Sequence, residues 1–150
     1  MMKNKIYLDT SVISALFDER TPERLSMTGD LWSKKLIEYE VVISELVLDE
    51  IERANEQVRD KMLSLIKDFI VLKVSEQAEE LAQIYIKQGI FPEKYFDDAL
   101  HVALASVNQI GILLSWNFTH LVKLKTRRMV SIVNLTENFI PVEIISPPEL

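Results

Sequence analysis

Acidic side chains occur next to or within apolar segments at three places in the chain. Asp9 directly follows the apolar segment KIYL. Glu50 falls within the apolar arc expected of a helix over residues 45–54, and Asp97 and Asp98 open the apolar segment ALHVALASV. A buried carboxylate without a partner costs several kcal/mol, and a helix dipole offsets less than about 1 kcal/mol of that cost. A bound cation would offset it for all three places together.

Each of these residues also has a plainer interpretation. Asp9, Thr10 or Ser11 can cap a helix over residues 12–17, and Glu50 can lie in a salt bridge or at the rim of its arc. One residue of the Asp97-Asp98 pair can cap its helix while the other is exposed. Asn117, which follows the segment ILLS, can begin a turn or can lie beside Asp9 at the end of a neighbouring strand. Taken singly, these residues leave both interpretations open.

The whole set indicates a hard metal ion. The chain has no cysteine, which excludes thiolate metal sites, iron–sulfur clusters and thiol nucleophiles. Carboxylate and amide oxygens are ligands for Mg²⁺ or Mn²⁺. Such an ion supports in-line attack of water on a phosphodiester, with a remaining carboxylate as general base. The three glycines form neither a dinucleotide-binding fingerprint nor a P-loop.

Short strand-like segments must position these residues. They lie at residues 5–8, 41–44, 70–74, 112–115 and 142–145 and alternate with longer stretches of helical periodicity. This alternation predicts an α/β fold, a three-layer α/β/α arrangement with a mostly parallel sheet of four to five strands. Ligands of such sheets gather at the carboxyl ends of the strands. We expect one domain over residues 1–145 and a short tail over 146–150.

Several boundaries of the helices can be predicted from single residues. Thr21 followed by Pro22 is typical of a helix start, and Ser44 and Ser75 are favoured caps for the segments that follow them. Gly89 is a plausible stop just after a helix.

Charge and hydropathy limit the partners. The 17 basic and 23 acidic residues give a net charge of −6, which argues against binding nucleic acid by bulk charge. A local basic strip can still contact RNA phosphates or simply form a solvated face; it comprises Lys123, Lys125, Arg127 and Arg128. The apolar runs fall short of the ~20 residues that span a bilayer, and the first residues lack a signal-peptide core. We expect a cytoplasmic protein without a membrane segment.

Four segments in order resemble the motifs of the PIN-domain family of metal-dependent ribonucleases, which includes VapC-type toxins of toxin–antitoxin pairs. They are YLDTSVI, ISELVLDEI, FDDALHVALA and LSWNFTHL. The resemblance implies that Asp9, Glu50 and Asp98 are metal ligands and that Asn117 assists catalysis. It also implies supporting roles for Asp97, Ser11 and Ser115. The family's carboxylate in the fourth motif is replaced by Asn117, which weakens a second metal site.

The resemblance therefore predicts an endoribonuclease that depends on Mg²⁺ or Mn²⁺, forms a homodimer and is silenced by an antitoxin protein covering its site. The alternative is a catalytically weak or inactive PIN-like scaffold that binds RNA or a protein partner; the acidic net charge favours it and the retained carboxylates argue against it. Two histidines remain. His101 shares a helix side with Asp98 and is more typical of a structural residue than of a ligand, while His120 can orient substrate.

Overall fold

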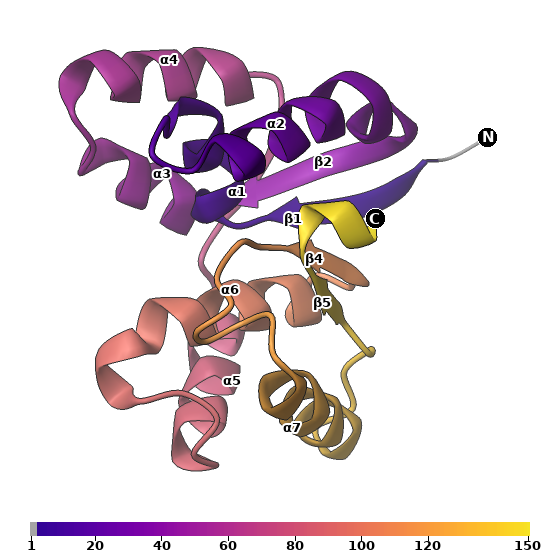
Figure 1. Ribbon diagram of the computed structural model, residues 1–150. Coiled ribbons are helices and arrows are strands. Elements are labelled where there is room, and N and C mark those ends of the chain that lie inside the picture. Colours follow the sequence, from indigo (N-terminus) through magenta and orange to yellow (C-terminus); the bar gives the residue numbers. More distant parts are fainter. Residues whose placement is uncertain (1–2) are drawn as a thin grey trace.

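A computed structural model describes residues 3–150. Its centre is a five-stranded sheet in which every neighbouring pair is parallel, with the order β3-β2-β1-β4-β5. Helices α1 to α4 lie on one side of the sheet and α5 to α7 on the other (Figure 1). This confirms the predicted three-layer α/β/α architecture. The strands are β1 Asn4–Leu8, β2 Tyr39–Ser44, β3 Ile70–Leu72, β4 Ile112–Leu114 and β5 Glu143–Ile145.

The helices connect the strands in the expected alternation. Those on the first side are α1 Thr10–Ser14, α2 Pro22–Asp30, α3 Glu45–Glu52 and α4 Glu56–Ile66. Those on the other side are α5 Glu76–Lys87, α6 Phe96–Val107 and α7 Leu124–Thr136. Shorter turns are the 3₁₀ segments Ala15–Phe17, Leu36–Glu38, Glu93–Tyr95 and Pro147–Glu149 and the π-helical segment Leu31–Lys35. No helix in the described part of the chain is both long and apolar enough to cross a bilayer.

The central strand β1 sets the position of the site. It pairs with β2 on one side and β4 on the other, and Ile6, Tyr7 and Leu8 are fully buried. The backbone N–H of Asp9 donates to Leu114 at 3.2 Å, so the ends of β1 and β4 lie side by side. Residues just beyond these two strands therefore meet at one edge, as parallel pairing requires.

Local signals at the helix ends behave as predicted. The hydroxyls of Ser44 and Ser75 accept hydrogen bonds from the first turns of α3 and α5, and Pro22 is the first residue of α2. Gly89, just past α5, has a φ of 78°, a conformation that a residue with a Cβ adopts only at a cost. The expected helix over residues 12–17 instead begins at Thr10, because Asp9 caps it, and becomes 3₁₀ after Ser14.

Helix α6 is the most deeply buried helix among residues 3–150. It packs along α5, and all its residues from Ala99 to Ser106 are buried. Its first turn, which carries Asp97 and Asp98, reaches the edge of the sheet where Asp9 lies. Because α6 is buried, Asp97 and Asp98 in its first turn lie at the border between the core and solvent.

The five residues expected as a tail are packed against the domain. Pro147 is buried, and Ser146 and Glu149 form a reciprocal capping box at the 3₁₀ turn. Glu149 also lies 3.6 Å from the Arg127 guanidinium on α7.

Candidate active site

Asp9 lies at the end of β1 and is only 4% exposed. One oxygen, Oδ1, accepts hydrogen bonds from the Ser11 hydroxyl at 2.5 Å and from the backbone N–H of Val12 at 3.4 Å. The other, Oδ2, accepts from the Ser115 hydroxyl at 2.6 Å. Burial raises the pKa of Asp9, and the nearby His101 and the two hydroxyls offset part of this rise. Asp9 is therefore both a helix cap and a carboxylate presented at a strand end.

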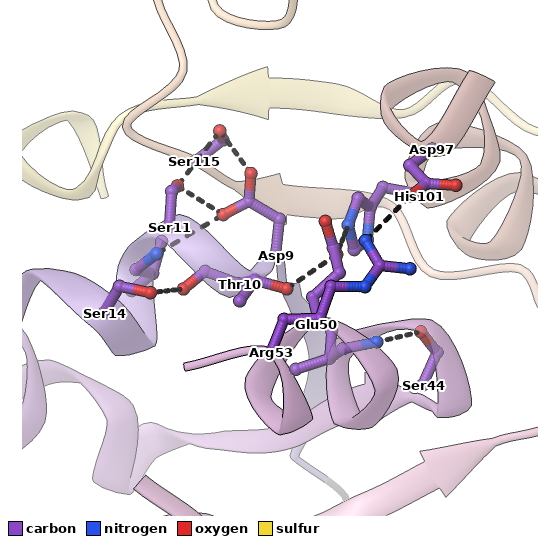
Figure 2. A network of polar contacts seen from close by, with 12 residues as sticks. Asp9, Thr10, Ser11, Ser14, Ser44, Glu50, Arg53, Asp97, His101 and Ser115 are labelled. Carbon is purple, nitrogen blue, oxygen red and sulfur yellow. Dashed lines mark hydrogen bonds and ion pairs between the residues drawn. The ribbon is translucent and has the colours of Figure 1, made fainter. Parts of the chain in front are cut away.

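Glu50 projects from α3 toward α6 and is paired. Its Oε1 accepts from the Thr10 hydroxyl at 2.8 Å and lies 2.6 Å from His101 Nε2 (Figure 2). Burial by itself would raise the pKa of Glu50, but the bonds and charge of His101 and the bond from Thr10 lower it on balance. With a quarter of its side chain exposed, Glu50 lies at the rim of the apolar arc in an ion pair. The structure therefore shows the plainer of the two interpretations of Glu50, a salt bridge at the rim of the apolar arc.

His101 lies within the core and connects Glu50 to the centre of the sheet. Its Nδ1 is 2.7 Å from the Tyr7 hydroxyl, which is in turn 2.8 Å from the Ser44 hydroxyl. Burial lowers the pKa of His101, but the hydrogen bond and charge of Glu50, with Asp9 and Asp98, raise it on balance. A protonated His101 beside an ionised Glu50 is consistent with both directions.

Tyr7 and Thr10 were not identified from the sequence. Tyr7 is a hydroxyl-bearing residue inside an apolar strand, and Thr10 stands next to Asp9. Both features were visible, but neither indicates which distant side chain the hydroxyl would contact.

The two aspartates at the start of α6 have different environments. Asp97 is 44% exposed and lies 3.8 Å from the Arg53 guanidinium. The half-buried Asp98 carboxylate has no hydrogen bond or ion pair to any residue from 3 to 150. Burial raises the pKa of Asp98; His101 and His120 oppose the rise, while the charges of Asp9 and Glu50 add to it. Asp98 is the least compensated carboxylate of the cluster.

The fourth motif contributes through Ser115 more directly than through Asn117. The Asn117 side-chain oxygen accepts from the backbone N–H of His120 at 2.9 Å, so it stabilises the turn before α7. The backbone N–H of Asn117 donates to the Ser115 hydroxyl, and this hydroxyl in turn donates to Asp9. Asn117 is thus linked to Asp9 through Ser115. The His120 ring lies against Tyr95, with centroids 4.1 Å apart, at the edge of the site near Asp98.

The basic strip lies at the start of α7. Lys125 and Arg128 are exposed and Lys123 is partly exposed, whereas Arg127 is drawn toward Glu149. Two of the four cations are therefore fully available to an anionic partner.

The donors of the site match a hard cation in chemistry. Asp9, Glu50 and Asp98 come from three separate elements and interact electrostatically, and all offer carboxylate oxygens. In the part of the chain that is described, no three acidic or histidine side chains already lie close enough to surround a metal ion. Figure 2 shows why: the Asp9 carboxylate faces Ser11 and Ser115, while Glu50 faces His101. The three carboxylates fit a hard cation in chemistry, and hydrogen bonds now hold Asp9 to Ser11 and Ser115 and Glu50 to Thr10 and His101.

The chain belongs to the PIN domain family, whose model matches residues 6–115. The match spans the central strand, the two other elements that supply carboxylates and the fourth motif as far as Ser115. No curated protein matches the chain by sequence.

Solved structures share the fold. VapC20 of Mycobacterium tuberculosis, described as a toxin that cleaves the sarcin–ricin loop, is 22% identical, has a TM-score of 0.58 and matches 72% of this chain and 86% of its own. VapBC-1 of nontypeable Haemophilus influenzae is 18% identical, with a TM-score of 0.59 and coverage of 96% and 98%. VapBC2 of Rickettsia felis, bound to a promoter DNA fragment, is 12% identical, with a TM-score of 0.56 and coverage of 95% and 98%. The fold is therefore that of VapC-type PIN domains.

Proposed function

We propose that the protein is an endoribonuclease that uses Mg²⁺ or Mn²⁺ and acts as the toxin of a toxin–antitoxin pair. The observation that carries this proposal is the Asp98 carboxylate, which is half-buried without a partner in residues 3–150 and experiences the charges of Asp9 and Glu50. A structural role would leave it paired or exposed, because uncompensated charge at a partly desolvated edge is costly. Membership of the PIN family supports the same conclusion.

The chain's residues divide into ligands and positioning groups. Asp9, Asp98 and Glu50 would hold the metal, which when bound activates water and stabilises charge on the leaving oxygen. Ser11 donates a hydrogen bond to one oxygen of Asp9 and Ser115 donates to the other, so the two serines fix the orientation of the carboxylate. His101 holds Glu50 in place through Nε2 and can neutralise its charge while the metal is absent.

The partners follow from the proposal. The substrate is RNA. Its phosphates would be contacted by the basic strip Lys123, Lys125, Arg127 and Arg128, of which Lys125 and Arg128 are the exposed members. Two of the similar structures are VapBC complexes, which supports an antitoxin as protein partner. A homodimer and a cytoplasmic location belong to the same proposal.

The test is cleavage of a mixed pool of structured RNAs by the purified protein with Mn²⁺, compared with EDTA and with Asp98→Asn. The matched control is Asp49→Asn, which makes the same change at an exposed aspartate on α3. We expect cutting by the wild type and by Asp49→Asn, and none with EDTA or Asp98→Asn. Cutting that persists in Asp98→Asn would refute the site assignment.

A second candidate is a PIN-like scaffold that binds RNA or protein without cleaving. The ion pair of Glu50 with His101 favours it, because that pair compensates Glu50 without a metal. Calorimetry with Mn²⁺ separates the candidates: the nuclease requires binding that weakens in Asp98→Asn, and the scaffold requires none.

A further inference from the structure

A hollow of about 310 Å³ opens on the side of α2 and is lined by Ser11, whose hydroxyl binds Asp9. Its lining includes Ser11 and Asn117 from the candidate site, together with Ser14, Thr21, Arg24 and Trp116. This volume is at the lower end of the roughly 300–1,000 Å³ typical of small-molecule sites. The hollow is therefore sized for one small group rather than for an extended ligand.

Arg24 supplies a free cation at this hollow. Its guanidinium carbon lies 5.4 Å from the ring centroids of both Trp116 and Phe118. Asp18, an acid that also lines the hollow, is bound by Arg20 through bonds of 2.9 and 3.0 Å and interacts electrostatically with Arg24 without forming an ion pair with it. No residue from 3 to 150 forms an ion pair or side-chain hydrogen bond with the Arg24 guanidinium. Two aromatic rings hold this cation while its charge stays available.

One of the two rings is fixed and the other is presented to solvent. Trp116 is 6% exposed, and its indole N–H donates to the Thr28 hydroxyl at 2.9 Å. Its backbone N–H donates to the Ser11 hydroxyl at 2.8 Å, the same hydroxyl that binds Asp9. Phe118 packs near Trp116 at 6.1 Å between centroids but remains 46% exposed. Trp116 is thus linked through Ser11 to Asp9, and Phe118 lies next to Trp116.

A planar guanidinium and an exposed aromatic ring are the surfaces on which unpaired RNA bases stack. We propose that Arg24 and Phe118 form a subsite for one unpaired nucleotide of the RNA, next to the bond that is cut. The base stacks on Phe118 and the guanidinium plane, and the charge of Arg24 attracts the adjoining phosphate. This inference rests on the proposed ribonuclease function and adds the position of a flanking nucleotide to it.

The subsite is tested by fluorescence anisotropy with labelled single-stranded oligoadenylate, in EDTA so that nothing is cut. The second probe is an abasic chain of equal length, which keeps the phosphates and lacks the bases. The variants are Phe118→Ala, at an exposed side chain, and Arg24→Ala. The matched control is Arg59→Ala, which removes the same charge on α4, away from the hollow.

We expect Phe118→Ala and Arg24→Ala each to weaken binding of oligoadenylate about tenfold, the order of one lost stacking contact. Phe118→Ala should bind the abasic chain as the wild type does, and Arg59→Ala should change either affinity less than twofold. Wild-type affinity for oligoadenylate in both subsite variants, or equal losses by Phe118→Ala on the two probes, would overturn the subsite.

The same preparations separate this inference from the proposed function. If the wild type cuts RNA with Mn²⁺ while both variants bind oligoadenylate normally, the subsite is wrong and the nuclease stands. If the wild type neither binds oligoadenylate nor cuts RNA, both proposals fail.

Discussion

At the scale of single residues, the carboxylates of the site differ in how their charge is compensated. Asp9 accepts three hydrogen bonds and Glu50 has an ion pair, whereas Asp98 has neither. Burial is the main cause that raises the pKa of Asp98, and the charges of Asp9 and Glu50 add to the rise. The stability of the metal-free protein should therefore respond most to this residue.

We expect Asp98→Asn to stabilise the metal-free protein at pH 7. The pKa of Asp98 is raised in the folded state, so its ionised form opposes folding. The gain should be largest above that raised pKa, should shrink as the pH falls through it, and should vanish below the unfolded value of about 3.9, where the wild-type group is protonated in both states. Thermal unfolding in EDTA between pH 4 and pH 7 measures it.

A gain that is the same at every pH would mean that the charge of Asp98 is not the cause. Asp49→Asn is the control, since that side chain is exposed and should show no comparable dependence on pH.

We expect Tyr7→Phe to lower the free energy of unfolding by about 1–2 kcal/mol, because it leaves the buried Ser44 hydroxyl and His101 Nδ1 each without their contact to the phenol. The ring itself remains, so packing is preserved. Tyr39→Phe is the control, since the Tyr39 hydroxyl makes no hydrogen bond within residues 3–150; it should change stability by less than about 0.5 kcal/mol. Urea unfolding measures the stability of both variants. Equal losses of stability would contradict a stabilising role for the hydrogen bonds of Tyr7 with Ser44 and His101.

At the scale of elements, most of the pattern was accessible from the sequence. The five strands occur where alternating apolar segments predicted them, and Ser44 and Ser75 cap the helices they precede. Hydrophobic periodicity and capping act over a few neighbouring residues, so they can be recognised without knowing the fold. Helix α1 begins at Thr10 rather than at residue 12, because Asp9 caps it although Thr10 and Ser11 are also favoured cap residues.

Replacing Gly29 or Gly89 by alanine should change the stability of the protein in opposite directions. Gly29 lies inside α2 and Gly89 follows α5 with a φ of 78°; an added Cβ would meet no atom within 4 Å at either position. Gly29→Ala should therefore stabilise by up to about 1 kcal/mol through helix propensity. Gly89→Ala should cost about 1–2 kcal/mol through its left-handed backbone. Urea unfolding gives both values, and effects of the same sign would contradict the backbone explanation.

At the scale of the whole molecule, the charge is acidic in sum and basic in one place. The net charge is −6, yet the start of α7, which follows the turn from the site, carries a run of cations. Lys125 and Arg128 are exposed, so they should contribute most to attraction of RNA. This distribution would let an acidic chain bind the RNA substrate that we propose.

We expect the double variant Lys125→Ala/Arg128→Ala to bind single-stranded RNA with a weaker dependence on salt. The slope of log affinity against log salt should fall in magnitude by about 1.4, since each phosphate contact contributes about 0.7. The control is Lys61→Ala/Lys67→Ala, which removes two exposed cations, one on α4 and one just after its last residue. Anisotropy titrations in EDTA over a range of salt measure the slopes, and an unchanged slope would remove the strip from the interface.

The sequence by itself determined the order of the elements, the parallel sheet and the three regions that supply the carboxylates. These depend on local periodicity and on the rule that ends of parallel strands share an edge. Only the tertiary structure decided which groups meet there. The contacts of Glu50 with His101 and of Tyr7 with Ser44 join residues 51 and 37 positions apart, and the Arg24 guanidinium lies over the ring of the distant residue Phe118. Such contacts are set by the packing of α3, α6 and α2 on the sheet, which no local pattern encodes.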